Sequence, residues 1–300
     1  MFKEKLAIII PTKNRPAELR RLLESVSAQN VRPDQIVIVD GGNIPSEEIP
    51  EKFPDLKIDY IRTVSASLTL QRNIGIRELK RGVSLAAFFD DDIILEESAL
   101  ENMLNFWETA PENTAGASFN IINVPYKKSN FLEKVFLVNA EKPARILRSG
   151  FQSRFSFQNE TAPAQWLVGC AMVWRKSIFG EFMFDEWFSG YARYEEVDFS
   201  YRVGRKYRMF VVAPAGVKHL NGPENIDFSF SLGKMQIVNR VYFVKKNPGL
   251  SVFLCYWACF GLFLNNLSRG LFCLDRRHIL RCKGNAAGFM EILLKKFPYR

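Results

Sequence analysis

The sequence predicts an α/β fold with an open, mostly parallel sheet flanked by helices and followed by a helical tail. Over the first 110 residues, short and nearly all-apolar segments alternate with segments whose apolar residues recur at helical spacing. The apolar segments lack alternating polar positions, which is typical of strands buried on both faces of a parallel sheet. The 300 residues are 47% hydrophobic and 24% charged, which suffices to bury a substantial core.

The first three elements form a predicted β-α-β unit. Residues 6–10 are an isoleucine-rich strand that we expect to end at Pro11. Residues 16–26 follow as a helix, because a proline stands in the first turn and leucines and a valine recur at helical spacing. Residues 36–39 form the second strand, which ends at the turn Asp40-Gly41-Gly42.

The alternation of strands and helices continues along the chain. Residues 111–165 contain four prolines and scattered aromatic residues, which predicts an inserted, irregular region that shapes a substrate pocket. Ligands of such sheets bind beyond the carboxyl ends of the strands, so the loops there are the candidate site. The other expected elements are strands at 56–61, 85–89 and 209–212 and helices at 68–79, 98–107 and 195–204, with regular structure resuming at 167–174.

The positive charge is concentrated in the tail. The chain has 41 Lys and Arg and 32 Asp and Glu, a formal net charge of +9. Residues 240–300 hold eleven basic and two acidic residues, which accounts for the whole excess. Residues 1–239 are formally neutral, which argues against a protein that coats nucleic acid.

Cysteine usage and the N-terminus favour a cytoplasmic catalytic domain. The five cysteines are odd in number, and no pair has the Cys-x-x-Cys spacing, so neither a disulfide framework nor a zinc site is indicated. The first five residues carry three charges and no apolar signal region precedes the first strand.

Three consecutive carboxylates follow the buried strand at 85–89, in the motif Phe89-Asp90-Asp91-Asp92. Crowded carboxylates raise one another's proton affinity unless a cation compensates, so the motif indicates a Mg²⁺ or Mn²⁺ site. Such ions keep part of their coordination shell for phosphates, which favours a nucleoside diphosphate as ligand. A solvated acidic turn would have the same sequence, and the three residues alone do not distinguish the two.

The other strand ends carry polar groups as well. The segment Pro11-Thr12-Lys13-Asn14-Arg15 supplies hydrogen-bond donors, and Asp40 can accept from a base or ribose or can belong to a plain turn. In the second helix, Arg72 can face a diphosphate. Gly75 lowers the stability of that helix, so its presence there indicates that another group approaches the helix closely. The chain has no glycine-rich phosphate loop, so no motif supports hydride transfer or NTP hydrolysis.

Four motifs in order resemble those of family 2 glycosyltransferases with the GT-A fold. They are Ile8-Ile9-Ile10-Pro11-Thr12-Lys13-Asn14-Arg15, Val37-Ile38-Val39-Asp40-Gly41, Arg72-Asn73-Ile74-Gly75 and Phe89-Asp90-Asp91-Asp92. The resemblance runs from about residue 5 to about residue 246 and is loose over 111–165. It implies a GT-A catalytic domain at 1–240, with a nucleotide-sugar half at about 1–110 and an acceptor half at about 111–240.

The resemblance implies roles for the motif residues. Asp90 and Asp92 match the two ends of the family's Asp-x-Asp motif, for Mn²⁺ or Mg²⁺, and the middle Asp91 makes the match ambiguous by one position. The implied nucleotide-sugar site comprises Pro11, Thr12, Asn14, Arg15, Asp40, Arg72, Asn73, Asp90 and Asp91.

Two later segments complete the resemblance. Trp166 and Gly169 lie in a segment that resembles the one beneath the acceptor, where Gly169 would let substrate approach the backbone. The segment from Tyr194 to Arg202 resembles the family's Glu-Asp-x-Asp helix start, but Glu196 stands where an aspartate acts as the base. Glu196 is therefore the first choice of base, with Glu195 or Asp198 as alternatives. A charged helix face would also explain these residues.

His219 is a further candidate metal ligand. A lone histidine at a strand end is often a structural hydrogen-bonding residue. The stretch from Pro214 to His219 resembles one in the family whose histidine contacts the metal or the diphosphate. Both interpretations remain open for His219.

The tail at 241–300 predicts contact with an anionic membrane surface. Between Lys246 and Arg269 lie 22 residues without formal charge, but Pro248, Gly249, Asn265 and Asn266 shorten the strongly apolar part to residues 250–264. That length favours an interfacial, monotopic or re-entrant helix over a spanning one. A single crossing would also place the basic residues outside, against the positive-inside tendency. The alternative is a soluble helical subdomain.

The expected function is an inverting, metal-dependent hexosyl- or deoxyhexosyl-transferase at the cytoplasmic face of the membrane. It would move a sugar from a UDP, dTDP or GDP sugar to a glycan or lipid-linked acceptor in surface polysaccharide assembly. A protein that binds nucleotide sugar without turnover and a sugar nucleotidyltransferase are the alternatives. The second would need a glycine-rich basic loop after the first strand, and Pro11 to Arg15 contains no glycine.

Overall fold

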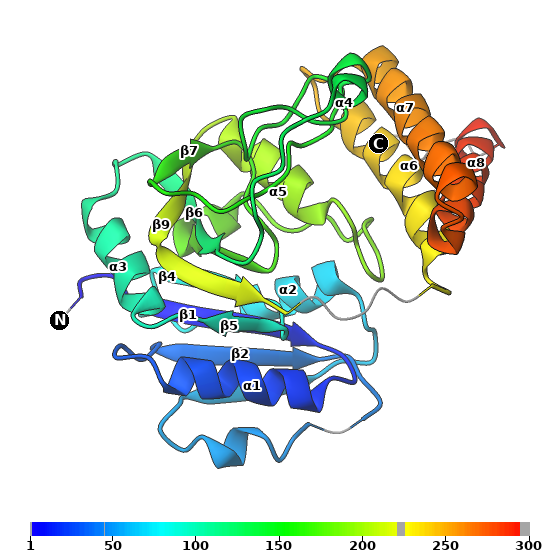
Figure 1. The fold of residues 1–300 in the computed structure, drawn as a ribbon. Helices are drawn as coiled ribbons and strands as arrows, with labels where there is room; N and C mark the ends of the chain where they lie inside the picture. Colours follow the sequence, from blue (N-terminus) through cyan, green and yellow to red (C-terminus); the bar gives the residue numbers. More distant parts are fainter. Residues whose placement is uncertain (1, 45, 221–225, 295–300) are drawn as a thin grey trace. The chain divides into compact units, whose positions relative to one another are not determined.

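The computed structural model describes residues 2–44, 46–220 and 226–294 and divides the chain into two compact units (Figure 1). The sheet unit comprises residues 1–126 and 155–221, and the helical unit comprises 127–154 and 222–300. The expected division at residue 240 falls inside a helix of the second unit. Residues 127–154, expected in the acceptor half, belong to the helical unit.

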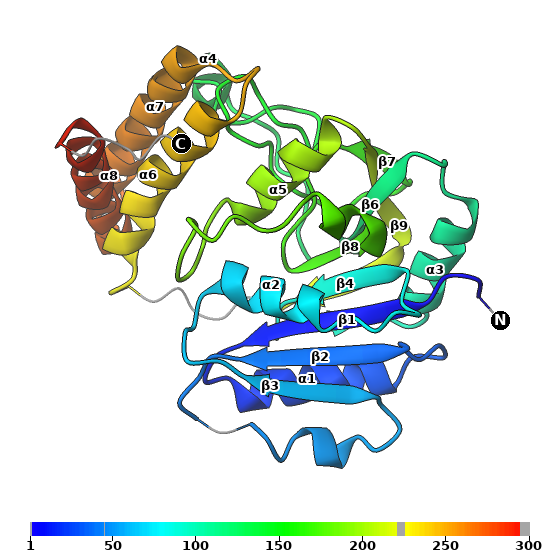
Figure 2. The same cartoon turned by 180° about the vertical axis from the view of Figure 1, so that it is seen from behind.

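The sheet unit contains a mixed sheet in the order β3-β2-β1-β4-β8-β6-β9-β5, with β7 paired to β9 (Figures 1 and 2). The first four strands are parallel, as predicted. Beyond β4 the sheet is mixed, because β8 is antiparallel to both β4 and β6, whereas β6 and β9 are parallel. The strands are β1 Leu6–Thr12, β2 Gln35–Asp40, β3 Ile58–Arg62, β4 Leu85–Phe89, β5 Ile93–Leu95, β6 Thr114–Ile121, β7 Ala162–Ala164, β8 Ala171–Arg175 and β9 Arg208–His219.

Helices cover both faces of the parallel half of the sheet (Figures 1 and 2). Leu6, Ile8 and Ile10 of β1 pack in one core with α1 (Pro16–Ser27) and α3 (Ala99–Thr109). The alternate residue Ile9 faces α2 (Leu68–Arg77) on the other side. The remaining helix of this unit is α5 (Glu195–Gly204), and short 3-10 helices lie at Pro50–Lys52 and Lys176–Gly180.

Several strands differ from the expectation, and β5 and β7 are strands that the sequence did not indicate. β1 continues through Pro11 to Thr12. Pro11 has no N–H to donate, and it is tolerated because the pairing of β1 with β4 has already ended at Ile9. Part of the supposedly irregular region is the fully buried strand β6, and β9 extends seven residues beyond Val212. The alanines, glycine and serine of β6 gave no strong apolar pattern.

Gly75 allows α2 to lie close to the sheet. A Cβ at position 75 would overlap Cγ2 of Ile9. The group that approaches Gly75 closely, as the sequence indicated, is therefore the side chain of Ile9 in β1.

The helical unit contains α4 (Phe131–Val135), α6 (Ser229–Lys246), α7 (Val252–Phe272) and α8 (Arg276–Leu294). α7 continues through Asn265 and Asn266, where the sequence suggested an end to the apolar segment. Among the described residues, no helix combines the length and the apolar character needed to cross a membrane. Three of the basic tail residues, Lys295, Lys296 and Arg300, lie outside the described residues.

Replacing Gly75 with alanine is expected to lower the free energy of unfolding by about 1–3 kcal/mol, because the added methyl group overpacks the contact with Ile9. Gly82→Ala is the control, since a Cβ there meets nothing within 4 Å. Urea unfolding of both variants measures the effect. A Gly75→Ala protein as stable as Gly82→Ala would contradict the packing described.

Candidate active site

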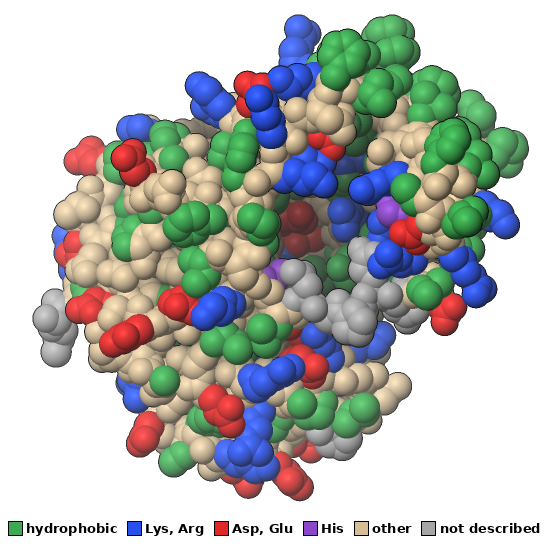
Figure 3. All heavy atoms as spheres, viewed as in Figure 1, with side chains coloured by type: hydrophobic (Ala, Val, Ile, Leu, Met, Phe, Trp, Pro, Cys, Tyr) green, Lys and Arg blue, Asp and Glu red, His purple; other side chains and the backbone are tan. Residues whose placement is uncertain are grey.

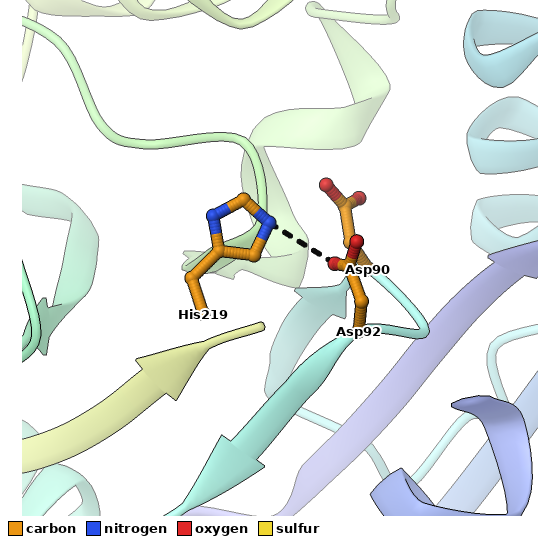
Figure 4. A group of neighbouring side chains, drawn as sticks. All are labelled: Asp90, Asp92 and His219. Carbon is orange, nitrogen blue, oxygen red and sulfur yellow. Dashed lines mark hydrogen bonds and ion pairs between the residues drawn. The ribbon is translucent and has the colours of Figure 1, made fainter. Parts of the chain in front are cut away.

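The three aspartates form the turn that joins β4 to β5, and Figure 4 shows two of them, Asp90 and Asp92. β5 pairs with β9 in a register that sets Ile93 opposite His219. The backbone N–H of Leu220 donates to the carbonyl of Asp92 at 2.7 Å and extends this pairing by one step. Strand pairing therefore brings His219 beside Asp92, although 127 positions separate them in the chain.

Asp90, Asp92 and His219 form a group suited to a divalent cation. One ligand atom from each lies within 4.8 Å of the others, and Nε2 of His219 is 3.0 Å from Oδ1 of Asp92. Figure 4 shows the imidazole pointing at the Asp92 carboxylate from the end of β9. Two carboxylates and an imidazole match the ligand preference of Mn²⁺, so the residues expected to bind metal fit that cofactor.

Asp92 and His219 shift each other's proton affinity. Burial raises the pKa of Asp92, but the hydrogen bond and charge of His219 and the Arg15 guanidinium lower it below its usual value. The same hydrogen bond raises the pKa of His219 above its usual value. Protons and a cation therefore compete for this pair.

Asp91 is directed toward Thr12, and it shares Arg15 with Asp92. Its Oδ2 accepts from the hydroxyl of Thr12 at 2.7 Å, and its Oδ1 is 2.7 Å from Nη1 of Arg15. Burial raises the pKa of Asp91 to about 7, although Thr12 and Arg15 oppose the rise. Asp91 thus joins the turn to the first loop, and Asp90 and Asp92 are the two that meet His219.

Arg72 of α2 lies at the centre of the site and is 1% exposed. Its Nη2 donates to Oδ1 of Asp90 at 3.2 Å and to the carbonyl of Gly169 at 2.8 Å, and its Nη1 donates to Glu195. A buried guanidinium is stable only when carboxylates and carbonyls surround it. Arg72 therefore fixes the position of the acidic turn relative to the start of α5.

The three candidate bases have different environments. Asp198 is fully buried and accepts from Nε of Arg202 at 3.0 Å. Glu195 is 2% exposed and binds Arg72, and burial raises its pKa to about 8 against the effect of that guanidinium. Glu196 is only partly buried, and its pKa is also raised by burial. Of the three, Glu196 keeps the most access to a substrate.

Gly169 lies next to these charged groups. A Cβ at this position would lie 3.3 Å from Cβ of Glu196 and 3.4 Å from both Nη2 of Arg72 and Oε1 of Glu195. The groups next to Gly169 are therefore the protein's own Arg72 and carboxylates, which the sequence did not reveal.

Residues 7–181, more than half of the chain, match the glycosyl transferase family 2 domain. The chain belongs to glycosyl transferase family 2. This membership covers the acidic turn, Arg72 and Gly169, whereas α5 and His219 lie beyond the matched segment.

Two curated relatives of this family 2 chain match it in part. It is 30% identical over 106 residues to glycosyltransferase GlyA of Streptococcus pneumoniae, which covers 34% of this chain and 15% of GlyA. It is 32% identical over 107 residues to the uncharacterized glycosyltransferase YwdF of Bacillus subtilis, which covers 35% of this chain and 39% of YwdF. The chain thus spans less than half of either relative.

Solved structures share the GT-A fold of this family 2 chain. S. aureus TarS 1-349 in complex with UDP-GlcNAc has a TM-score of 0.59 at 13% identity, covering 96% of this chain and 81% of that one. Mannosyltransferase PcManGT from Pyrobaculum calidifontis, in complex with GDP-Man and Mn²⁺, has a TM-score of 0.59 at 12% identity, covering 99% and 89%. At such identities the likeness concerns the fold.

Two of the residues expected to bind nucleotide hold neighbouring loops in this family 2 domain. Oδ1 of Asn14 accepts from the N–H groups of Asn43 at 2.6 Å and Ile44 at 2.9 Å. Asp40 is fully buried and accepts from the N–H of Gly42 at 2.7 Å and the hydroxyl of Tyr60 at 2.5 Å. These bonds shape the loops after β1 and β2.

Other expected site residues lie apart from the acidic group. The side-chain amide of Asn73 makes two hydrogen bonds with the backbone of Phe184: Nδ2 donates to its carbonyl at 2.9 Å, and Oδ1 accepts from its N–H at 3.0 Å. Pro11 is buried within β1. Trp166 is 6% exposed and packs edge-on against Phe155. The structure brings none of these three into contact with Asp90 or Asp92.

Sequence reasoning missed two residues of β3. Tyr60 donates to Asp40, and burial together with that bond raises the pKa of Tyr60 to about 12. Nη2 of Arg62 donates to the carbonyl of Gly42 at 2.8 Å. The available signal was the strand itself, since polar residues two apart at its carboxyl end reach the same loop.

Replacing Arg72 with methionine is expected to lower the free energy of unfolding by about 3–5 kcal/mol, because the Glu195 carboxylate loses its buried partner. Arg77→Met on the same helix is the control, since Arg77 is exposed and its change should stay within about 0.5 kcal/mol. Urea unfolding measures both. Equal stabilities of the two variants would show that the Arg72 network does not hold the site together.

Mn²⁺ binding is expected to weaken by about tenfold or more in Asp92→Asn, whereas Asp55→Asn, an exposed control, should bind like the wild type. Affinity should also fall as the pH drops through the raised pKa of His219, because a protonated imidazole cannot ligate a metal. Isothermal titration at several pH values measures both effects. Unchanged affinity in Asp92→Asn, or binding insensitive to pH between 8 and about 5.5, would exclude this group as the metal site.

Proposed function

We propose that the protein transfers a hexosyl or deoxyhexosyl group from a nucleoside diphosphate sugar to a hydroxyl of a glycan or lipid-linked acceptor, with inversion at the anomeric carbon. The observation that carries the proposal is the meeting of Asp90, Asp92 and His219 next to the Arg72 network, within a family 2 domain. Crowded carboxylates beside an imidazole at the carboxyl ends of strands are suited to binding a cation and a diphosphate.

The donor class rests on chemistry and on related folds. TarS and PcManGT were solved with UDP-GlcNAc and GDP-Man, respectively, which supports a nucleotide sugar as ligand of this fold. The bound metal, Mn²⁺ or Mg²⁺, would supply positive charge to the leaving diphosphate. Thr12 and Arg15, which both contact Asp91, lie at the end of β1 and in the loop after it, where they would face this nucleotide. UDP, dTDP and GDP sugars all meet these requirements.

Glu196 is the proposed general base. Glu195 already binds Arg72 and Asp198 binds Arg202, so both are committed to internal ion pairs. A pKa raised by burial suits Glu196 to taking up a proton, provided that it is ionised when the acceptor binds. Glu196 lies beside Gly169, whose carbonyl accepts a hydrogen bond from Arg72.

The proposed reaction is a single displacement. Glu196 removes the proton of the acceptor hydroxyl while the hydroxyl oxygen attacks the anomeric carbon from the face opposite the nucleotide. The bond from the anomeric carbon to the diphosphate oxygen breaks with its electron pair, so a nucleoside diphosphate leaves. Arg72 holds Asp90 and Glu195 in place during this step and does not itself take up a proton.

An acceptor in surface polysaccharide assembly fits the basic tail, since such acceptors are anchored in lipid. Membership of family 2 argues against a nucleotidyltransferase. The remaining alternative is a protein that binds nucleotide sugar without turnover. Under this alternative the wild type catalyses no transfer, so replacing Glu196 would change no measured rate.

Glu196→Gln is expected to reduce transfer by about a hundredfold or more while leaving the affinity for the nucleotide sugar unchanged, because only the base is lost. The donor is first found by scoring UDP, dTDP and GDP sugars with Mn²⁺ for thermal stabilisation and for release of nucleoside diphosphate. Glu112→Gln, at an exposed position outside the site, is the control.

Full activity of Glu196→Gln together with loss of activity in Glu195→Gln would move the base to Glu195. No turnover of any donor by the wild type, despite tight binding of one of them, would support the non-catalytic alternative.

A further inference from the structure

α7 exposes large apolar side chains and buries small ones. Phe253, Trp257, Phe260, Leu267 and Leu271 recur at spacings of four, three, seven and four, so they form one stripe, and each is at least 37% exposed. The opposite face buries Cys255, Ala258, Cys259, Asn266 and Gly270. A helix on the surface of a water-soluble domain has the reverse arrangement, with its large apolar residues inside.

The interior of the helical unit is built from small residues. A Cβ at Gly233 would overlap the backbone of Arg281, and one at Gly284 would overlap the carbonyl of Phe230, so α6 and α8 pack almost backbone to backbone. Nδ2 of Asn266 donates to Oδ1 of Asn285 at 2.8 Å between α7 and α8. Small residues and interhelical amide bonds are typical of helices that pack in an apolar surrounding.

α4 extends the stripe of α7 into a continuous apolar surface. Nε1 of Trp257 donates to the carbonyl of Val135 at 2.9 Å, and the rings of Trp257 and Phe136 are 4.9 Å apart. Figure 3 shows hydrophobic side chains gathered over α4 and α7, with Lys and Arg side chains nearby. The apolar surface consists of Phe131, Leu132, Val135, Phe253, Trp257, Phe260, Leu267, Leu271, Phe272 and Leu274.

The helical unit carries more positive charge than the tail alone, which has a net charge of +9. It holds nineteen Lys and Arg and six Asp and Glu, a net charge of +13, whereas the sheet unit holds 22 and 26, a net charge of −4. Residues 127–154 contribute seven of the basic and two of the acidic residues. The fold thus unites two basic segments that are separated in the sequence.

We propose that the apolar surface of α4 and α7 docks on an anionic lipid bilayer. The exposed rings and leucines would enter the acyl boundary, while the basic residues of the unit bind lipid phosphates. Docking parallel to the membrane requires no spanning helix, which agrees with the described helices. A second copy of the chain is a poorer occupant of this surface, because two units of net charge +13 repel each other.

The proposal is independent of sugar transfer and is tested with the full chain without donor or metal. Flotation with vesicles of phosphatidylcholine, with and without phosphatidylglycerol, measures the partition coefficient. We expect wild-type protein to bind the anionic vesicles and the double variant Phe253→Ser/Phe272→Ser to bind about tenfold more weakly or worse. Val64→Ser/Phe157→Ser, two exposed apolar positions of the sheet unit, is the control and should bind like the wild type.

A second variant tests the electrostatic part without touching the apolar surface. Lys127→Glu/Lys128→Glu should also lose about tenfold or more on anionic vesicles, whereas Lys52→Glu/Lys57→Glu in the sheet unit should not. Thermal melting confirms that each variant is folded, and light scattering reports the oligomeric state. The proposal is overturned if the wild type does not bind anionic vesicles, if both helical-unit variants bind as well as their controls, or if Phe253→Ser/Phe272→Ser converts a stable dimer into a monomer.

Discussion

The buried guanidinium of Arg72 is the interaction on which the rest of the candidate site depends. It reaches three parts of the chain that are distant in sequence: the acidic turn after β4 through Asp90, the loop before β8 through Gly169, and the first residue of α5 through Glu195. Removing a guanidinium from water costs several kcal/mol unless charged partners surround it. These partners therefore have to meet around Arg72, and the proposed metal ligands and the proposed base are brought together with them.

The position of α2 follows from the same requirement. Arg72 reaches the site only because the helix lies close to β1, and Gly75 permits that approach one turn later. The other fixed point is the pairing of β5 with β9, which sets His219 beside Asp92. One constraint comes from packing and the other from strand register. Together they determine which of the three neighbouring aspartates meet the histidine.

The parallel half of the fold could be predicted from the sequence because β1, β2 and β4 consist mainly of continuous apolar runs. The second half could not, since β6 is built largely from alanine, glycine, serine and threonine, and its burial comes from its neighbours. The joining of residues 127–154 to the C-terminal helices was equally hidden. It depends on contacts such as Trp257 with Val135, more than a hundred residues apart, which no local pattern encodes.

For the site, three consecutive aspartates at a strand end sufficed to indicate a cation site, because polar groups at the carboxyl ends of neighbouring strands meet. The choice of Asp90, Asp92 and His219 as ligands came from the resemblance to family 2, and Arg72 was proposed to face a diphosphate from the second helix. Only the structure reveals that Asp91 is directed toward Thr12 and that Asp40 and Asn73 make internal hydrogen bonds. From the sequence, a hydrogen-bonding side chain can bind a ligand or a loop equally well. Gly169 shows the same ambiguity, because its neighbours are the protein's own charged groups.

The central claim is that one carboxylate activates the acceptor for a single displacement of the nucleoside diphosphate. The most direct test is the anomeric configuration of the product, read by proton NMR in the first minutes of reaction with an α-linked donor, before any slow equilibration. The account predicts a β-linked product, because a single displacement inverts the centre. An α-linked product would require two displacements or a front-face reaction and would contradict it.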